Sequence, residues 1–159
     1  TNITIKLYDY IKSLINKNDN VLDLYCGIGS ITIYIADKCN NVYGVEIIND
    51  AILNANENKK LNNIDNIEFK CNDISKILNQ YKDIDTIVLD PPRIGINKIA
   101  LNNILEIDAK HIVYISCNST TLARDLNIFK DKYNIISLKL FDMFPNTNHI
   151  ESVVLLERK

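Results

Sequence analysis

Short apolar runs alternate with helical segments along almost the whole chain, and this alternation limits the folds it can adopt. The apolar runs have the length of buried strands, and segments of about ten residues with helical spacing separate most of them. We expect strands at residues 21–25, 41–45, 67–71, 86–89, 111–115, 135–141 and 152–156. We expect helices at residues 30–38, 50–61, 74–81, 98–107 and 120–129. Asn49 or Asp50 is a suitable cap for the second of these helices.

Strands that alternate with helices predict an α/β fold, with a mostly parallel sheet covered by helices on both faces. Only residues 142–150 connect the last two strands, and a connection without a helix favours an antiparallel final pair. The sheet expected therefore has seven strands. A chain of 159 residues fits a single domain, which we place at residues 1–159. Because the first residue is not methionine, we expect the domain to be a fragment of a longer protein.

The composition argues against several other classes of protein. No apolar run approaches the roughly 18 residues that span a membrane, and the N-terminal residues do not resemble a secretory signal. The four cysteines are widely spaced and include no Cys-x-x-Cys pair, so we expect no metal site and a reducing, cytoplasmic compartment. The net charge of −2 lacks the basic excess that nucleic-acid-binding domains usually carry.

A glycine turn follows the first expected strand. Gly27 and Gly29 allow the backbone to turn tightly and to approach a ligand closely. Dinucleotide-binding turns have a third small residue where this chain has Thr32. The turn alone therefore indicates only a nucleotide-like ligand at the carboxyl end of a strand.

Acidic side chains accompany three successive strand ends. Glu46 is placed to accept both ribose hydroxyls of an adenosine. Asp23 is placed to orient the turn or to receive an amino group, and Asp73 falls where an adenine edge would lie. Asp23 or Glu46 taken alone is more simply interpreted as an acid in a solvated loop. Three acids together disfavour a pyrophosphate and favour S-adenosylmethionine as the cofactor.

Residues 90–93, with the sequence DPPR, follow the fourth strand beside the expected cofactor cleft. Methyltransferases that act on the adenine amino group usually have an aromatic residue after the two prolines, and this chain has Arg93. An exocyclic amine is therefore disfavoured as the methyl acceptor. The same segment could also serve only to end the strand, because proline continues neither a ladder nor a helix.

Cys117 differs from the other three cysteines, which we interpret as small buried hydrophobic residues. It follows the fifth strand and precedes a helix that begins near Thr120, where the helix N-terminus is expected to favour a thiolate. A thiolate that adds to carbon 6 of uracil makes carbon 5 nucleophilic enough to accept a methyl group. A base must then remove the proton from carbon 5, and Glu151 is the best remaining candidate. An exposed acid on an edge strand is an equally open interpretation of Glu151.

Together these residues resemble the RNA (uracil-5-)-methyltransferase family, and the resemblance covers nearly the whole chain. It depends on residues 23–29 (DLYCGIG), 90–93 (DPPR), 116–118 (SCN) with 121–125 (TLARD), and 142–145 (DMFP) with 149–151 (HIE). The resemblance implies a Rossmann-like class I methyltransferase fold. It also implies that Cys117 is the nucleophile and that Glu151 is the proton acceptor. The cofactor contacts it implies are Tyr25, Ser30, Glu46, Asp73 and Asp90.

The resemblance also sets expectations for the partners. It implies a ribosomal or transfer RNA substrate with a flipped-out uridine, of which we favour ribosomal RNA, and no membrane partner. Ser30 stands where the family usually has asparagine. Members carry a Phe-x-Gln-x-Asn segment, of which Thr1 and Asn2 resemble the end, and usually an N-terminal RNA-binding domain. RNA affinity is therefore expected to depend on regions that precede this chain.

Two other functions remain open. A cytosine-5-methyltransferase needs the same thiolate chemistry, but those acting on RNA generally have a cysteine where this chain has Pro92. A non-catalytic module would bind the cofactor and RNA without transferring a methyl group.

Overall fold

A computed structural model describes residues 2–143 and 150–159, with only the backbone described at residues 77 and 78. The motif residues Phe144, Pro145 and His149, and Thr1, lie outside the described part. The strands are β1 (Asn20–Leu24), β2 (Asn41–Glu46), β3 (Ile67–Cys71), β4 (Thr86–Leu89), β5 (His111–Ser116), β6 (Tyr133–Phe141) and β7 (Glu151–Arg158). The helices are α1 (Asn2–Leu14), α2 (Ser30–Ile35), α3 (Asn49–Leu61), α4 (Ile74–Ile77), α5 (Lys98–Ile107) and α6 (Ser119–Phe129), with 3-10 turns η1 (Ala36–Lys38) and η2 (Leu78–Gln80).

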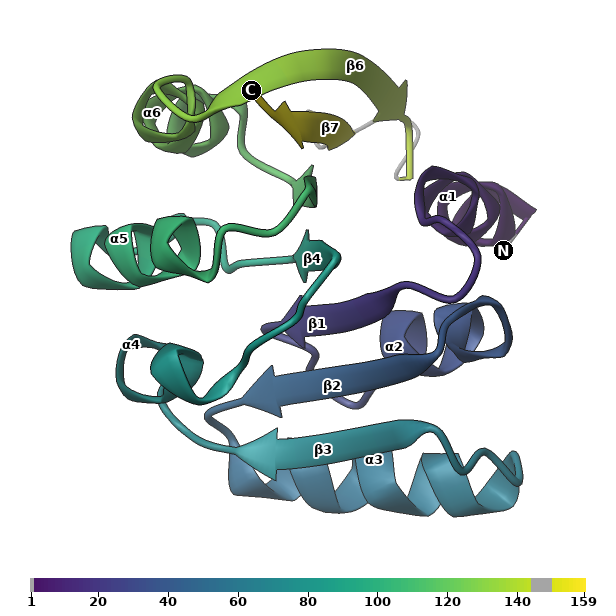
Figure 1. The fold of residues 1–159 in the computed structure, drawn as a ribbon. Helices are drawn as coiled ribbons and strands as arrows, with labels where there is room; N and C mark the ends of the chain where they lie inside the picture. Colours follow the sequence, from purple (N-terminus) through teal and green to yellow (C-terminus); the bar gives the residue numbers. More distant parts are fainter. Residues whose placement is uncertain (1, 144–149) are drawn as a thin grey trace.

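The strands form one sheet in the order β3-β2-β1-β4-β5-β7-β6 (Figure 1). β1 pairs in parallel with β2 on one side and with β4 on the other, so the chain builds the sheet outward in two directions from β1. β7 runs antiparallel to both of its neighbours. The expected seven-stranded, mostly parallel sheet with an antiparallel last strand is therefore confirmed.

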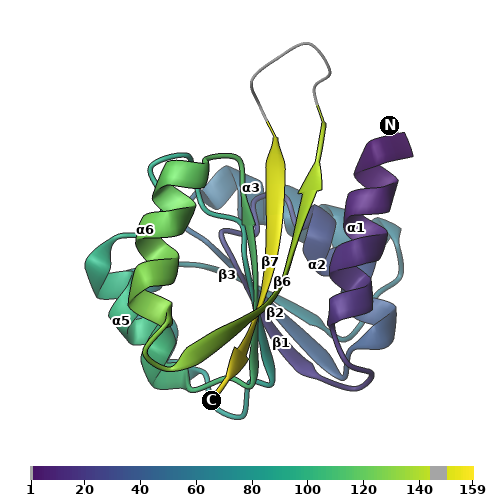
Figure 2. The same ribbon diagram turned by 90° about the horizontal axis from the view of Figure 1, so that it is seen from above.

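Helices cover both faces of the sheet, as expected (Figure 2). On one face, α1 and α2 pack onto alternate residues of the central strands, such as Val21 and Val88. On the other face, α5 and α6 pack onto the intervening residues, such as Leu22 and Ile87. Because both faces are buried, the central strands have continuous apolar runs rather than alternating ones.

Several local predictions were wrong. No helix was expected before β1, although Leu7, Ile11 and Ile15 repeat at a spacing of four and are buried. The expected helix 30–38 is α2 followed by the 3-10 turn η1, and 74–81 is likewise α4 and η2. Neither Asn49 nor Asp50 caps α3, whose N-cap is Ile48 without a side-chain bond. In the described part of the chain, no helix is both long and apolar enough to span a bilayer.

Candidate active site

The carboxyl ends of β1 and β4 meet at the switch point of the sheet, which is where open α/β sheets bind ligands. The turn after β1 begins at Tyr25, whose φ of 64° is left-handed and therefore strained for a residue with a side chain. Backbone bonds hold the turn: Cys26 N–H donates to the carbonyl of Val45 (3.1 Å), and Gly29 N–H donates to that of Cys26 (2.9 Å). The turn is thus fixed against β2 before α2 begins.

Gly29 is required in this turn for two reasons. Its φ is 80°, and a Cβ atom placed there would lie 2.5 Å from Cζ of Phe69 on β3. Gly27, with a φ of 54°, has no atom within 4 Å of the corresponding Cβ position. Gly29 therefore allows tight packing, whereas Gly27 keeps a space open in front of the turn.

Glu46 stabilises the same turn from the end of β2. Its Oε2 accepts a hydrogen bond from Gly27 N–H (3.2 Å), and its Oε1 accepts from Ile47 (2.8 Å) and Ile48 (3.1 Å). A carboxylate offers about four acceptor positions, so these bonds leave little capacity for a ribose diol. Its role as a ribose ligand stays a prediction, beside an observed role in holding the turn.

Asp23 is almost completely buried beneath the turn, with 1% of its surface exposed. Its Oδ2 accepts a hydrogen bond from the Thr32 hydroxyl (2.5 Å), which explains the threonine at the position of the third small residue. Its Oδ1 is buried and has no hydrogen-bond partner among the described residues. Burial raises the pKa of Asp23 to about 7, opposed by the bond from Thr32 and assisted by Asp90 and Glu46. The site thus contains a buried acceptor with unused capacity.

A cavity of about 210 Å³ lies at this turn. Asp23, Tyr25, Gly27, Ser30 and Asp90, all expected cofactor contacts, line it together. The other lining residues are Tyr8, Cys26, Ile28 and Ile31. The structure therefore gathers most of the expected contacts around one space.

Tyr8 of α1 is a lining residue that was not predicted, because no helix was expected there. Burial raises the pKa of Tyr8. The hydrogen bond with Ser30 lowers it in part, and the charges of Asp90 and Asp23 raise it further. These neighbours place its hydroxyl beside the acidic side of the cavity.

Asp73 does not line this cavity. Its Oδ1 accepts from both the N–H (2.9 Å) and the hydroxyl (2.7 Å) of Ser75, and these bonds lower its pKa. The described role of Asp73 is to begin α4, and its contact with an adenine stays a prediction.

Cys117 directly follows β5, and Glu151 begins β7, the antiparallel neighbour of β5, at the same rim. Ser116, which precedes the cysteine, pairs with Ser152, which follows the glutamate. Burial and then Glu151 raise the pKa of Cys117, and the same two causes raise the pKa of Asp90 to about 7. Three titratable groups are therefore close enough to influence one another electrostatically.

The expectation that a helix N-terminus favours the Cys117 thiolate was wrong in direction. The pKa of Cys117 is raised, first by burial and then by Glu151, and the nearby Arg93 opposes this only in part. The Asn118 side chain accepts from the N–H groups of Thr120 (3.0 Å) and Thr121 (3.5 Å), so the first amides of α6 are already capped. Burial and Glu151 thus favour the protonated thiol of Cys117.

The other cysteines are free thiols in different environments. Cys39 is buried and Cys26 is half-buried, as a small hydrophobic residue would be, but Cys71 is exposed. The interpretation of Cys71 as a buried residue was wrong because it ends β3 at the edge of the sheet.

The sheet order and the antiparallel β7 define a class I S-adenosylmethionine-dependent methyltransferase fold. The N-methyltransferase NodS of Bradyrhizobium japonicum has this fold, with a TM-score of 0.82 over all of this chain and 98% of its own, at 15% identity. The family model for tRNA (uracil-5-)-methyltransferase matches residues 1–159. The chain belongs to this family, which confirms the resemblance.

More similar relatives support the same family. An uncharacterized RNA methyltransferase of Clostridium acetobutylicum is 42% identical over 97% of this chain and 35% of its own length. The tRNA (uracil-54, C5)-methyltransferase of Pyrococcus abyssi, solved with S-adenosyl-L-homocysteine, has a TM-score of 0.87 and 34% identity, over 96% of this chain and 37% of its own. This chain thus spans about a third of the length of these relatives.

Proposed function

We propose that this chain binds S-adenosylmethionine beside the β1 turn and forms the catalytic domain of an enzyme that methylates carbon 5 of a uridine in RNA. The observation that carries the proposal is the arrangement at the rim. Cys117 and Glu151 lie at the end of the β5–β7 pair. Asp90, whose pKa is raised by burial and then by Glu151, also lines the cavity.

The cavity is suited to this cofactor. The unpartnered Oδ1 of Asp23 is a buried acceptor suited to the ammonium group of a methionine moiety. Gly27 leaves the front of the turn open, and Tyr25 and Ser30 are walls of the same space. When bound, S-adenosylmethionine supplies a methyl group on a positively charged sulfur. The Pyrococcus abyssi relative binds the demethylated product, which supports the assignment.

The residues at the rim supply the remaining chemistry. Because the pKa of Cys117 is raised, its thiol must first give up a proton, and Asp90, with a pKa of about 7, is a suitable acceptor. The thiolate adds to carbon 6 of a flipped uracil, and carbon 5 then takes the methyl group. Glu151 removes the proton from carbon 5, and the bond between sulfur and carbon 6 breaks to restore Cys117.

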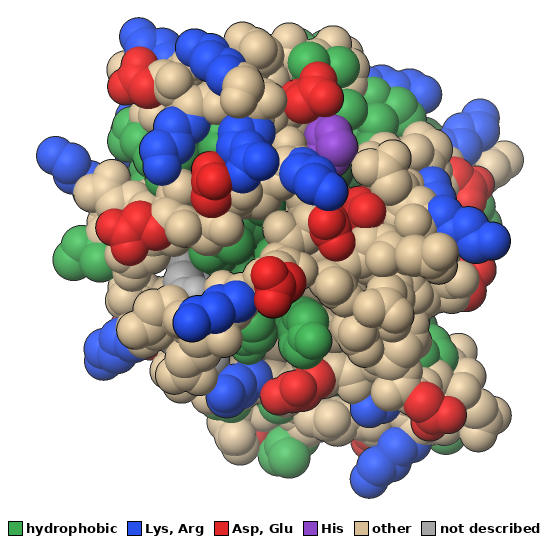
Figure 3. Space-filling view, in the orientation of Figure 1, with side chains coloured by type: hydrophobic (Ala, Val, Ile, Leu, Met, Phe, Trp, Pro, Cys, Tyr) green, Lys and Arg blue, Asp and Glu red, His purple; other side chains and the backbone are tan. Residues whose placement is uncertain are grey.

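This domain presents no uniformly basic surface on the face shown in Figure 3, where Lys and Arg side chains are interspersed with Asp and Glu. Together with the net charge of −2, this supports RNA binding that depends on other parts of the full-length protein. The names of the family model and of the Pyrococcus abyssi relative both specify tRNA. Ribosomal RNA, a cytoplasmic location and a single domain over residues 1–159 stay predictions.

The proposal can be tested with RNA that contains 5-fluorouridine, since fluorine at carbon 5 cannot leave as a proton and the covalent adduct accumulates. The full-length protein should form an adduct that survives denaturing electrophoresis. Cys117→Ala should form none, and the control Cys71→Ala, at an exposed thiol on β3, should form it normally. An adduct that persists in Cys117→Ala would exclude Cys117 as the nucleophile.

A second variant tests the base. In the Glu151→Gln variant, Cys117 should still add to the uridine of natural RNA, and carbon 5 should still take the methyl group. Product release should be slow, so that the adduct accumulates without fluorine. Normal turnover of Glu151→Gln would remove the glutamate from the mechanism.

A further inference from the structure

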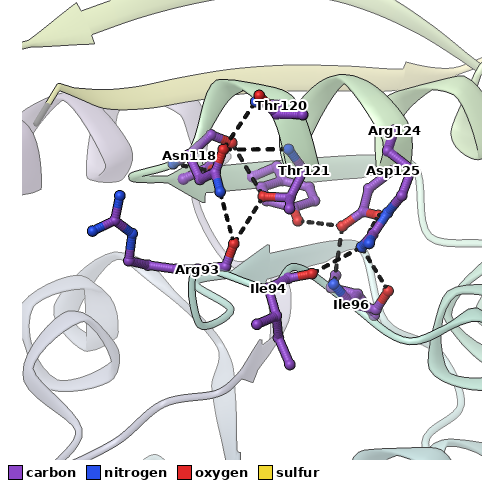
Figure 4. Close-up of polar contacts among 10 residues, drawn as sticks. Arg93, Ile94, Ile96, Asn118, Thr120, Thr121, Arg124 and Asp125 are labelled. Carbon is purple, nitrogen blue, oxygen red and sulfur yellow. Dashed lines mark hydrogen bonds and ion pairs between the residues drawn. The ribbon is translucent and has the colours of Figure 1, made fainter. Parts of the chain in front are cut away.

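Residues 93–96, which begin at the last residue of the DPPR segment, are bound along their backbone by side chains of α6 and of its N-cap, Asn118 (Figure 4). We propose that Asp125 and Arg124 are positioning residues for the methyl transfer. Together they form a clamp, by which we mean the hydrogen bonds that hold the loop after β4 onto α6 and so fix the active-site segments relative to each other. The proposal rests on the function proposed above.

Asp125 is the buried centre of this clamp, with none of its surface exposed. Its Oδ2 accepts from the N–H of Ile96 in the loop (3.0 Å) and from the hydroxyl of Tyr114 on β5 (2.7 Å). Its Oδ1 accepts from Nε of Arg124 (2.9 Å). A buried carboxylate is tolerated only when it is paired and hydrogen-bonded, and these three residues provide both.

Arg124 extends the clamp to two further points of the loop. Its Nη2 lies 2.7 Å from Oδ1 of Asp125 and also donates to the carbonyls of Ile94 (3.1 Å) and Ile96 (3.2 Å). The planar guanidinium can bind a carboxylate and two carbonyls in one fixed geometry, which the ammonium of lysine cannot do.

The start of α6 holds the loop at a third point. The amide of Asn118 donates to the Arg93 carbonyl (3.0 Å), and so does the hydroxyl of Thr121 (3.2 Å). The Arg93 backbone is therefore fixed, while its guanidinium extends away from these bonds (Figure 4). That guanidinium is also the cation that acts on Cys117.

Gly95 shows how closely the loop approaches the clamp. Its φ is 75°, and a Cβ atom there would lie 2.5 Å from Nη2 of Arg124 and 2.8 Å from Oδ2 of Asp125. Any other residue at this position would displace both partners. The clamp can therefore be disturbed from the loop side without changing either charged residue.

The two segments that the clamp joins carry the proposed reacting groups. The loop follows directly from Asp90 and includes Arg93, and α6 begins two residues after Cys117. None of the residues of the clamp lines the cofactor cavity. Disturbing the clamp should consequently slow the chemical steps and leave cofactor affinity unchanged.

The experiment compares Arg124→Lys and Gly95→Ala in the full-length protein, at a temperature where circular dichroism shows each variant to be folded. We expect kcat to fall at least tenfold in both, with the Kd of S-adenosyl-L-homocysteine, measured by calorimetry, within twofold of the parent. Formation of the 5-fluorouridine adduct should slow to a similar extent. Tyr133→Phe is the matched control, because it removes a buried hydroxyl bonded to the Ala109 carbonyl (2.7 Å) away from the rim.

A purely structural role would give a different pattern. The proposal is overturned if the variants only unfold at a lower temperature and keep their kcat, if Arg124→Lys keeps full kcat, or if Tyr133→Phe loses as much activity as they do. If the parent protein transfers no methyl group, the proposed function itself has failed. An active parent with fully active clamp variants rejects the positioning role alone.

Discussion

The two glycines of the β1 turn should respond very differently to the same substitution. Alanine at position 27 adds a Cβ atom in open space, so its cost is the left-handed backbone alone, about 1–2 kcal/mol. Alanine at position 29 has the same backbone cost and also overlaps the ring of Phe69, which adds about 1–3 kcal/mol of overpacking. We therefore expect Gly29→Ala to be less stable than Gly27→Ala by about 1–3 kcal/mol.

Thermal unfolding followed by circular dichroism measures this difference. For a chain of this size, about 1 kcal/mol shifts Tm by roughly 2–4 °C, so the two variants should differ by about 2–12 °C. The double variant Gly29→Ala with Phe69→Leu should recover part of the loss, because the smaller side chain vacates the position of the overlap. Equal losses at the two glycines, or no recovery with Phe69→Leu, would refute the assigned contact.

Three further changes have defined outcomes. Thr32→Val removes the donor to the buried Asp23 carboxyl and should cost about 1–3 kcal/mol in urea unfolding, whereas Thr32→Ser should keep most of the stability. Asp23 has a folded pKa of about 7, above its ordinary value of 3.8, so the folded protein holds this proton more tightly than the unfolded chain does. The resulting stabilisation of the fold is complete below pH of about 4 and is lost as pH rises through about 7. This loss should be on the order of 4 kcal/mol, and Asp23→Asn should flatten that part of the profile of unfolding free energy against pH. Asn118→Ala should cost about 1–2 kcal/mol because the α6 cap is lost, and Asn118→Asp should retain the cap but not the bond to Arg93.

The architecture follows from local patterns, so the sequence was sufficient to predict it. Apolar runs such as residues 86–89 are strands because both faces of the sheet are covered, and the short connection 142–150 determines the antiparallel end. The first helix was predictable as well, since Leu7, Ile11 and Ile15 have helical spacing. Without this helix, the contribution of Tyr8 to the cavity could not be predicted either.

The properties of the site residues depend on contacts between distant segments, and these were harder to predict. The position of Cys117 before a helix predicted a lowered pKa, but Glu151 arrives from another strand and Asn118 already caps the helix. Asp125 belongs to the TLARD segment of the resemblance, but its role could not be predicted, because its partners come from β5 and from the loop after β4. Local pattern thus predicted which residues gather at the rim, and the structure determined their electrostatics.

The most direct test of the central claim is the chemical identity of the methylated nucleoside. The full-length protein would be incubated with S-adenosylmethionine carrying an isotopically labelled methyl group, and with unmodified ribosomal and transfer RNA in separate reactions. After digestion to nucleosides, mass spectrometry should find the label in 5-methyluridine from one of the two RNA classes, and Cys117→Ala should abolish it. Label in 5-methylcytidine or on an exocyclic amine, or cofactor binding without any labelled nucleoside, would contradict the account.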